Sequence, residues 1–166
     1  MISIPNRFLV NGRPTIKDFE PNESLYFRFS SEHFPDETRL PVAAIRFPDF
    51  SVNAGSLSQP SDVLIPHWIN LGIAELKVSA IPLPLRSDDK NDEREFSFKA
   101  CHDPIDETHP AYSKQQFENY AHTEIRAFLE NEHFKKDPPK SVRKKFRLIL
   151  SDATKIIIIL LPASKT

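Results

Sequence analysis

Hydrophobic and polar residues alternate over short segments in the first half of the chain, which predicts β-strands. In the segment 24–29, Leu25, Phe27 and Phe29 alternate with more polar residues, the pattern of a strand with one buried face. Further strands, rich in aromatic or aliphatic side chains, are expected over residues 7–10, 42–47, 72–81 and 95–101. Between them we expect a loop over 49–59, a short helix from Pro60 and a charged hairpin tip over 86–95.

Apolar residues in the second half follow a helical spacing instead. Ser113 and Gln116 have the spacing of a capping box, and apolar residues then recur from Phe117 to Leu129. A second amphipathic helix is expected to begin near Ser141. The isoleucine-rich segment 155–161 predicts a last strand that is buried on both faces.

The segment from Tyr120 to Leu129 has two interpretations that differ in their chemistry. In a strand, His122, Glu124 and Arg126 would project from one face. In a helix, Glu118, His122 and Arg126 would form a ladder at i, i+4 spacing while Glu124 turns away. The capping-box spacing and the longer apolar stripe favour the helix.

These elements predict a single α+β domain over residues 1–166. We expect a largely antiparallel sheet of short, proline-bounded strands with one or two amphipathic helices packed on it. The length suffices for a sizeable core, and 13 phenylalanines indicate a folded chain. The chain has 15 prolines against 3 glycines and lacks a glycine-rich phosphate-binding motif.

The cysteine count and the apolar runs bear on the compartment. Cys101 is the only cysteine, which excludes an intrachain disulfide and a four-cysteine zinc site. The start of the sequence lacks the pattern of a secretory signal, and the longest apolar run is far shorter than the roughly 20 residues of a spanning helix. We therefore predict a cytoplasmic protein with no membrane span. No oligomeric state or cofactor follows from the sequence.

Candidate catalytic chemistry gathers in the segment 101–126. Four of the six histidines lie close together in the sequence: His102, His109, His122 and His133. Histidine titrates near neutral pH and can act as a general acid or base. The candidate catalytic residues are His102, Asp103, His122, Glu124 and Arg126.

Two kinds of chemistry are compatible with these residues. His102 and Asp103, with His122 or Glu124, could bind a metal ion that keeps a position open for water. The histidine spacings match no recognised zinc signature, so we assign no metal ligand. Without a metal, two histidines, or His122 with Glu124, could transfer protons while Arg126 stabilises an oxyanion on phosphorus.

A basic stripe provides a separate candidate for binding. Between residues 135 and 147 there are seven lysines or arginines and one acid. Along one flank of the expected helix the stripe contains Lys140, Arg143, Lys144 and Arg147. Such a stripe could contact an anionic partner, either a nucleic acid or an acidic protein surface. The net charge of the whole chain is only −1, so the basic character is local.

Two functional hypotheses follow. The leading one is a non-catalytic module that binds a protein or a nucleic acid, because no strong catalytic motif is present. The alternative is a small histidine-dependent hydrolase, of phosphodiesterase or ribonuclease type, centred on His102 and His122.

Overall fold

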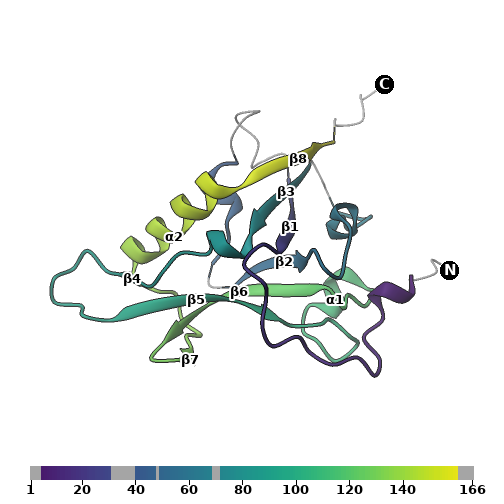
Figure 1. Ribbon diagram of the computed structural model, residues 1–166, viewed down its shortest axis with the longest axis horizontal. Helices are drawn as coiled ribbons and strands as arrows, with labels where there is room; N and C mark the ends of the chain where they lie inside the picture. The colour runs from purple at the N-terminus through teal and green to yellow at the C-terminus, as the bar shows by residue number, and fades with distance from the viewer. Residues whose placement is uncertain (1–4, 31–39, 48, 69–71, 161–166) are drawn as a thin grey trace.

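The computed structural model describes residues 5–30, 40–47, 49–68 and 72–160 (Figure 1). The strands are β1 (Ser24–Phe29), β2 (Phe50–Ala54), β3 (Gly72–Lys77), β4 (Leu85–Arg86), β5 (Glu95–His102), β6 (His122–Leu129), β7 (Glu132–His133) and β8 (Lys155–Ile159). The α-helices of this part of the chain are α1 (Tyr112–Gln115) and α2 (Lys140–Ala153). Short 3-10 turns cover Asn6–Phe8, Val42–Ala44, Pro60–Val63 and Val78–Ala80.

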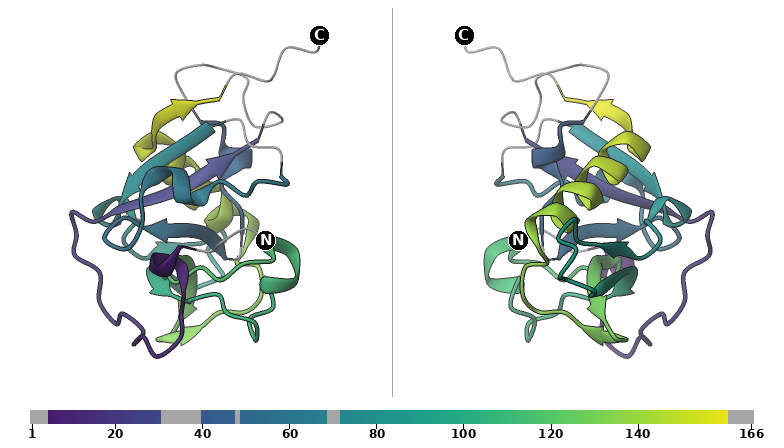
Figure 2. Two further views of the ribbon diagram at one scale, coloured as in Figure 1. Left: turned by 90° about the vertical axis from the view of Figure 1, so that its right-hand side faces the viewer. Right: turned by 90° about the vertical axis from the view of Figure 1, so that its left-hand side faces the viewer.

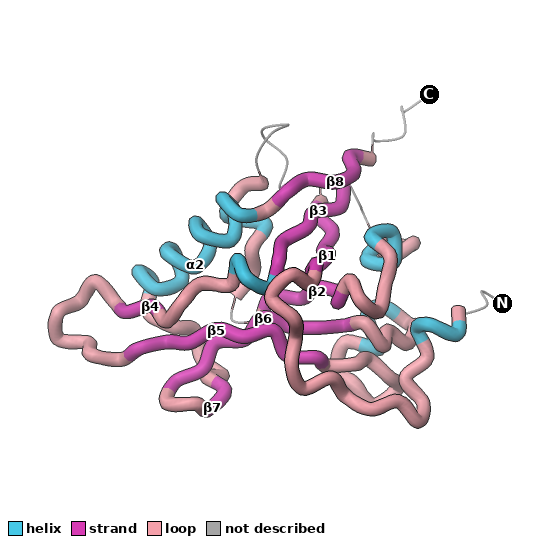
Figure 3. The backbone as a smooth tube through the Cα atoms, viewed as in Figure 1, coloured by secondary structure: helices cyan, strands magenta, loops and turns pink. Residues whose placement is uncertain are grey.

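All of the described strands belong to one antiparallel sheet, so the fold is mixed α+β and mostly sheet. Seven strands follow each other in the order β4-β5-β6-β2-β1-β3-β8, and β7 pairs with β6. In Figures 1 and 2, β1 and β3 run steeply across the direction of β5 and β6, which gives the sheet its open, curled form. Figure 3 shows how much of the chain outside the sheet is loop.

The core lies between one face of this sheet and α2. Alternation along β1 turns Leu25, Phe27 and Phe29 inward, and α2 contributes Phe146 and Leu150 to the same cluster. Side chains of this size, each removed from water, contribute about 1.5–3 kcal/mol apiece to folding. None of the helices among the described residues is long and apolar enough to cross a membrane.

Several expected elements of the first half take a different form. Val42–Ala44 is a 3-10 turn that follows Pro41, not part of a strand, and it still sends Ala44 and Ile45 into the core. The segment 7–10 likewise begins within a 3-10 turn, and β3 ends at Lys77, before the 3-10 turn Val78–Ala80. Apolar side chains can therefore reach a core from a turn, and strand-like composition does not by itself form a ladder.

β2 is a strand where a loop was expected. Phe50, Val52 and Ala54 are buried in alternation, and Ser51 and Asn53 lie on the other face. β2 pairs with β1 on one side and with β6 on the other. Polar and apolar residues alternate regularly along β2, but the polar ones make the segment resemble a loop in the sequence.

The expected helix over 117–129 is wrong. α1 has a single turn and ends where Gln116 adopts a left-handed conformation, with φ 62°. Residues His122–Leu129 then form β6, which pairs along its length with β5 and in part with β2. Hydrogen bonding to neighbours on both sides outweighs the local preference for helix.

β8 also departs from the expected environment. It forms an end of the strand order beside β3, and Ile157 is exposed, so the prediction of a strand buried on both faces is wrong. Leu161, the expected last residue of the strand, lies outside the described residues.

Candidate functional site

The candidate site lies on the face of the sheet that turns away from α2. Ile125 and Ala127 of β6 point into the core with Phe146, so His122, Glu124 and Arg126 project from the opposite face. The strand register brings other polar residues of that face beside them: Cys101 and Ser51 flank Glu124, Lys99 flanks Arg126, and Asn53 flanks His122. The row that the strand interpretation predicts is therefore present.

A charged network holds this row in place. Arg126 donates through Nε and Nη2 to Glu124 Oε2, at 3.1 and 2.9 Å, and through Nη2 to Asp103 Oδ2 at 2.6 Å. His109 Nε2 lies 3.0 Å from the same Asp103 oxygen. Burial raises the pKa of Asp103, but the bond from His109 and the charge of Arg126 outweigh it and lower that pKa overall. Asp103 is thus held as a carboxylate.

His122 has one ring nitrogen committed and one left as an acceptor. Nδ1 lies 2.7 Å from the backbone oxygen of Asp103, and a carbonyl only accepts, so Nδ1 carries the proton. Burial lowers the pKa of His122, against the opposing effects of that bond and of Glu124. The ring is therefore neutral at pH 7, with its lone pair on Nε2, which lies 3.8 Å from Glu124 Oε1.

His109 has the opposite tautomer. The backbone N–H of Ala111 donates to Nδ1 at 3.0 Å, so the ring proton is on Nε2 and points at Asp103. The two rings of His109 and His122 meet edge to face, with centroids 5.6 Å apart.

These tautomers do not match a three-ligand metal site. One nitrogen from each of His109 and His122 and a carboxylate oxygen of Asp103 lie within 4.8 Å of one another, a spacing that a metal ion could span. A ligating imidazole offers a lone pair and donates its other N–H to an acceptor. His122 meets this condition, but the free lone pair of His109 accepts from Ala111 and its proton faces Asp103. The donor set therefore favours chemistry without a metal.

His102 lies on the other face of the sheet and does not join this group. It stands opposite Thr123 in the register, in line with the buried Phe96 and Phe98. Its Nδ1 accepts the backbone N–H of Ile16 at 2.8 Å, and its Nε2 donates to the backbone oxygen of Tyr120. Both nitrogens are used, so His102 ties two loops to the sheet and we leave it out of the proposed catalytic group.

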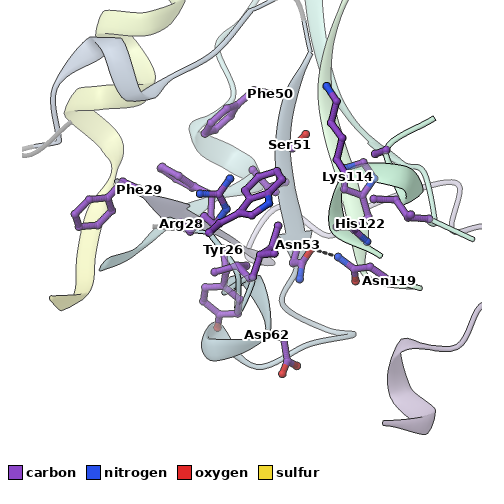
Figure 4. A pocket seen from close by; sticks show the side chains of 18 of the residues that line it. Tyr26, Arg28, Phe29, Phe50, Ser51, Asn53, Asp62, Lys114, Asn119 and His122 are labelled. Atoms are coloured by element: carbon purple, nitrogen blue, oxygen red, sulfur yellow. Dashed lines mark hydrogen bonds between the residues drawn. The ribbon is translucent and has the colours of Figure 1, made fainter. Parts of the chain in front are cut away.

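A cavity of about 270 Å³ opens beside His122 on the same face (Figure 4). Its polar wall combines Arg28 of β1, Asn53 of β2 and Lys114 of α1 with His122. The Arg28 guanidinium lies over the ring of Trp68, 4.1 Å from its centroid. Burial, assisted by repulsion from Arg46, lowers the pKa of Arg28 to about 10. The cavity is therefore positively charged and partly shielded from water.

The other candidate residues lie elsewhere. The basic stripe is on α2, where Lys140 and Lys144 are exposed, while Arg143 and Arg147 are half-buried. Arg143 also approaches Asp137 at 3.3 Å. Cys101 is on the polar face, but burial raises the pKa of its thiol, which opposes a role as a nucleophilic thiolate.

Sequence reasoning left four residues of this region out of its candidate site: Arg28, Asn53, His109 and Lys114. In the sequence, Arg28 is only a polar position within an alternating strand pattern, and the residues around Asn53 predict a loop. His109 was one of the four clustered histidines, but nothing local linked it to Asp103. The alternation that turns Phe96 and Phe98 inward was a signal that His102 faces the core as well.

Compared with known protein families, curated proteins and solved structures, the chain shows no significant match.

Proposed function

We propose that this chain is a small histidine-dependent hydrolase that acts on a phosphate ester without a metal ion, with His122 as the general base. The observation that supports this most is the Nε2 lone pair of His122 beside Glu124 Oε1, at 3.8 Å. Two acceptors at this spacing can receive the two O–H groups of one water molecule and orient its lone pair outward. Lys114 and Arg28, which line the same cavity as His122, favour a negatively charged substrate.

The reaction needs one proton acceptor that later returns its proton. His122 Nε2 takes a proton from the attacking water molecule as the new oxygen–phosphorus bond forms. The bond from phosphorus to the leaving oxygen then breaks, and the His122 imidazolium gives its proton to that oxygen. Glu124 stabilises the imidazolium by charge, and Arg126 acts as a positioning residue that orients Glu124 and Asp103. With Nε and Nη2 already engaged, Arg126 is a poor choice for the oxyanion role expected from the sequence.

The test is His122→Gln, assayed with bis(4-nitrophenyl) phosphate and with a labelled single-stranded RNA. We expect the variant to lose about 10²–10⁴-fold in turnover, the usual contribution of a general base. Its melting temperature should change little, because glutamine can still donate to the carbonyl of Asp103. His133→Gln is the matched control: His133 contacts Asp49, away from this network, and its replacement should leave turnover unchanged. Failure of the unmodified protein to hydrolyse either substrate, or equal turnover by His122→Gln, would contradict the proposal.

A second candidate function is binding of an anionic partner, a nucleic acid or an acidic protein surface, by the stripe Lys140, Arg143, Lys144 and Arg147. One observation favours it. Lys140 and Lys144 lie one helical turn apart on α2, both exposed, and no carboxylate among the described residues forms an ion pair with either. Lys145, by contrast, is paired with Asp88. The two exposed ammonium groups are the part of the stripe available to phosphates or carboxylates.

A further inference from the structure

The wall of the cavity beside His122 has positive groups whose charge the acid of that wall does not balance. Of the described residues that line it, Asp62 is the one acid. Both oxygens of Asp62 accept hydrogen bonds from Arg7, at 3.1 and 2.9 Å, and Oδ2 also accepts the backbone N–H of Gln59. Arg28 therefore faces the cavity with Arg46 as a neighbouring like charge, and the acid of the wall is already neutralised by Arg7.

The contacts of Arg28 also indicate that its positive charge is not balanced by an acid among the described residues. In the described part of the chain, its guanidinium has a contact with the Trp68 ring and no carboxylate partner. Other arginines of the same chain behave differently: Arg7, Arg94 and Arg126 each hold a carboxylate, and each has a raised pKa. Arg28 is the contrasting case, a half-buried cation with a lowered pKa. A cation in that setting is stabilised when an anion binds beside it.

A buried amide adds a directional donor. Asn53 is only 3% exposed, and its Oδ1 accepts from Asn119 Nδ2 at 2.8 Å, as Figure 4 shows. Its Nδ2 has no hydrogen-bond partner, although leaving a buried donor unpaired is energetically unfavourable. Asn53 lines the cavity, but its Nδ2 is itself covered, so a rotation of the side chain that brings Nδ2 to the cavity wall would let it donate to an acceptor oxygen there.

The ligand that meets these demands is small, anionic and rich in acceptor oxygens. The volume of about 270 Å³ is slightly below that of pockets that hold drug-sized molecules. Arginine forks, ammonium groups and amide N–H groups are the usual partners of phosphate oxygens. A phosphoryl group combines the charge, the size and the acceptors.

We propose that Arg28, Lys114 and the Asn53 amide form a phosphate-binding subsite in this cavity, which holds the phosphoryl group of the substrate next to His122. The assignment of the bound phosphoryl group to a substrate rests on the proposed function. The binding itself does not, because it can be measured without turnover.

The experiment measures the affinity of the full chain for inorganic phosphate and for dimethyl phosphate by calorimetry, with chloride at matched ionic strength as the reference. Arg28→Gln should weaken phosphate binding at least about tenfold, the effect of losing a charge-assisted hydrogen bond. Lys114→Gln, at an exposed position, should weaken it as well and serves if Arg28→Gln is poorly folded. Arg86→Gln, which removes an exposed arginine paired with Glu95, should bind like the unmodified protein. Stronger binding of the diester than of free phosphate would assign the subsite to a chain phosphate.

Equal phosphate affinity in Arg28→Gln, Lys114→Gln and the unmodified protein, or no binding by any of them, would overturn the subsite. His122→Gln separates the two proposals, because it should keep phosphate affinity while losing turnover. Phosphate binding that depends on Arg28, in a protein without turnover, would support the subsite and contradict the hydrolase. Turnover that is lost in His122→Gln but unchanged in Arg28→Gln would support the hydrolase and contradict the subsite.

Discussion

Three histidines of one short stretch serve different purposes because their hydrogen bonds assign their protons differently. His102 and His109 each accept a backbone N–H at Nδ1 and carry the proton on Nε2. His122 donates a hydrogen bond from its Nδ1–H to a carbonyl and keeps Nε2 as an acceptor. Residue type and sequence spacing were therefore enough to find the histidines, but not to rank them. The ranking depends on which backbone groups fold against each ring.

His102 provides a stability prediction at this scale. His102→Ala should lower the free energy of unfolding at pH 7 by about 1–3 kcal/mol, because the N–H of Ile16 and the carbonyl of Tyr120 lose their partner. Chemical denaturation measures this, and His133→Ala, at a half-buried position, should cost less. An unchanged free energy of unfolding would show that His102 does not tie these loops to the sheet.

The same residue makes stability depend on pH. Burial holds the pKa of His102 below its ordinary value of 6.5, which applies in the unfolded chain. As the pH falls below 6.5, the unfolded state therefore binds a proton that the folded state does not, and the free energy of unfolding decreases. Above 6.5 both states are neutral and this effect vanishes. His122 acts in the same direction, so His102→Ala should have a shallower acid decline than the unmodified protein, not a flat one.

At the scale of elements, the sequence predicts correctly the helices and strands whose own residues show a clear hydrophobic period. β1, β5 and α2 have clear periods, and the structure has them close to the expected residues. β6 was misjudged, because its residues also suit a helix and the choice depends on β5 and β2 lying on either side. A strand between two partners is decided by pairing across the chain, which one segment of sequence does not reveal.

The basic flank of α2 supports a prediction for this element. The double variant Lys140→Glu and Lys144→Glu should weaken binding to labelled single- or double-stranded nucleic acid and lower the salt dependence of affinity by about two units, one per lysine. Its control is Lys135→Glu with Lys136→Glu, an equal charge change at exposed positions before the helix. The same affinity and salt slope in both double variants would remove α2 as an anion-binding surface. Arg143 and Arg147 are unsuitable for this test, because their Nε atoms are buried.

At the scale of the whole molecule, the curled sheet separates a core face from a polar face. The α2 helix covers the first, and the second brings Arg28, Asn53 and His122 around one cavity, joined by Lys114 from α1. These four residues are far apart in the sequence and meet because β2 lies between β1 and β6. Strand order follows from the packing of the complete chain. The sequence could therefore predict the row of His122, Glu124 and Arg126 on β6 as one of two alternatives, but it could not predict the cavity.

The central claim is that Nε2 of His122 is unprotonated at neutral pH and can accept a proton. Long-range ¹H–¹⁵N correlation spectra of protein labelled in its histidines, assigned with the His122→Gln variant, measure this directly. The account predicts at pH 7 a neutral His122 with its proton on Nδ1, a neutral His102 with its proton on Nε2, and a proton on Nε2 of His109. A His122 that is protonated at pH 7, or that carries its proton on Nε2, would contradict the account.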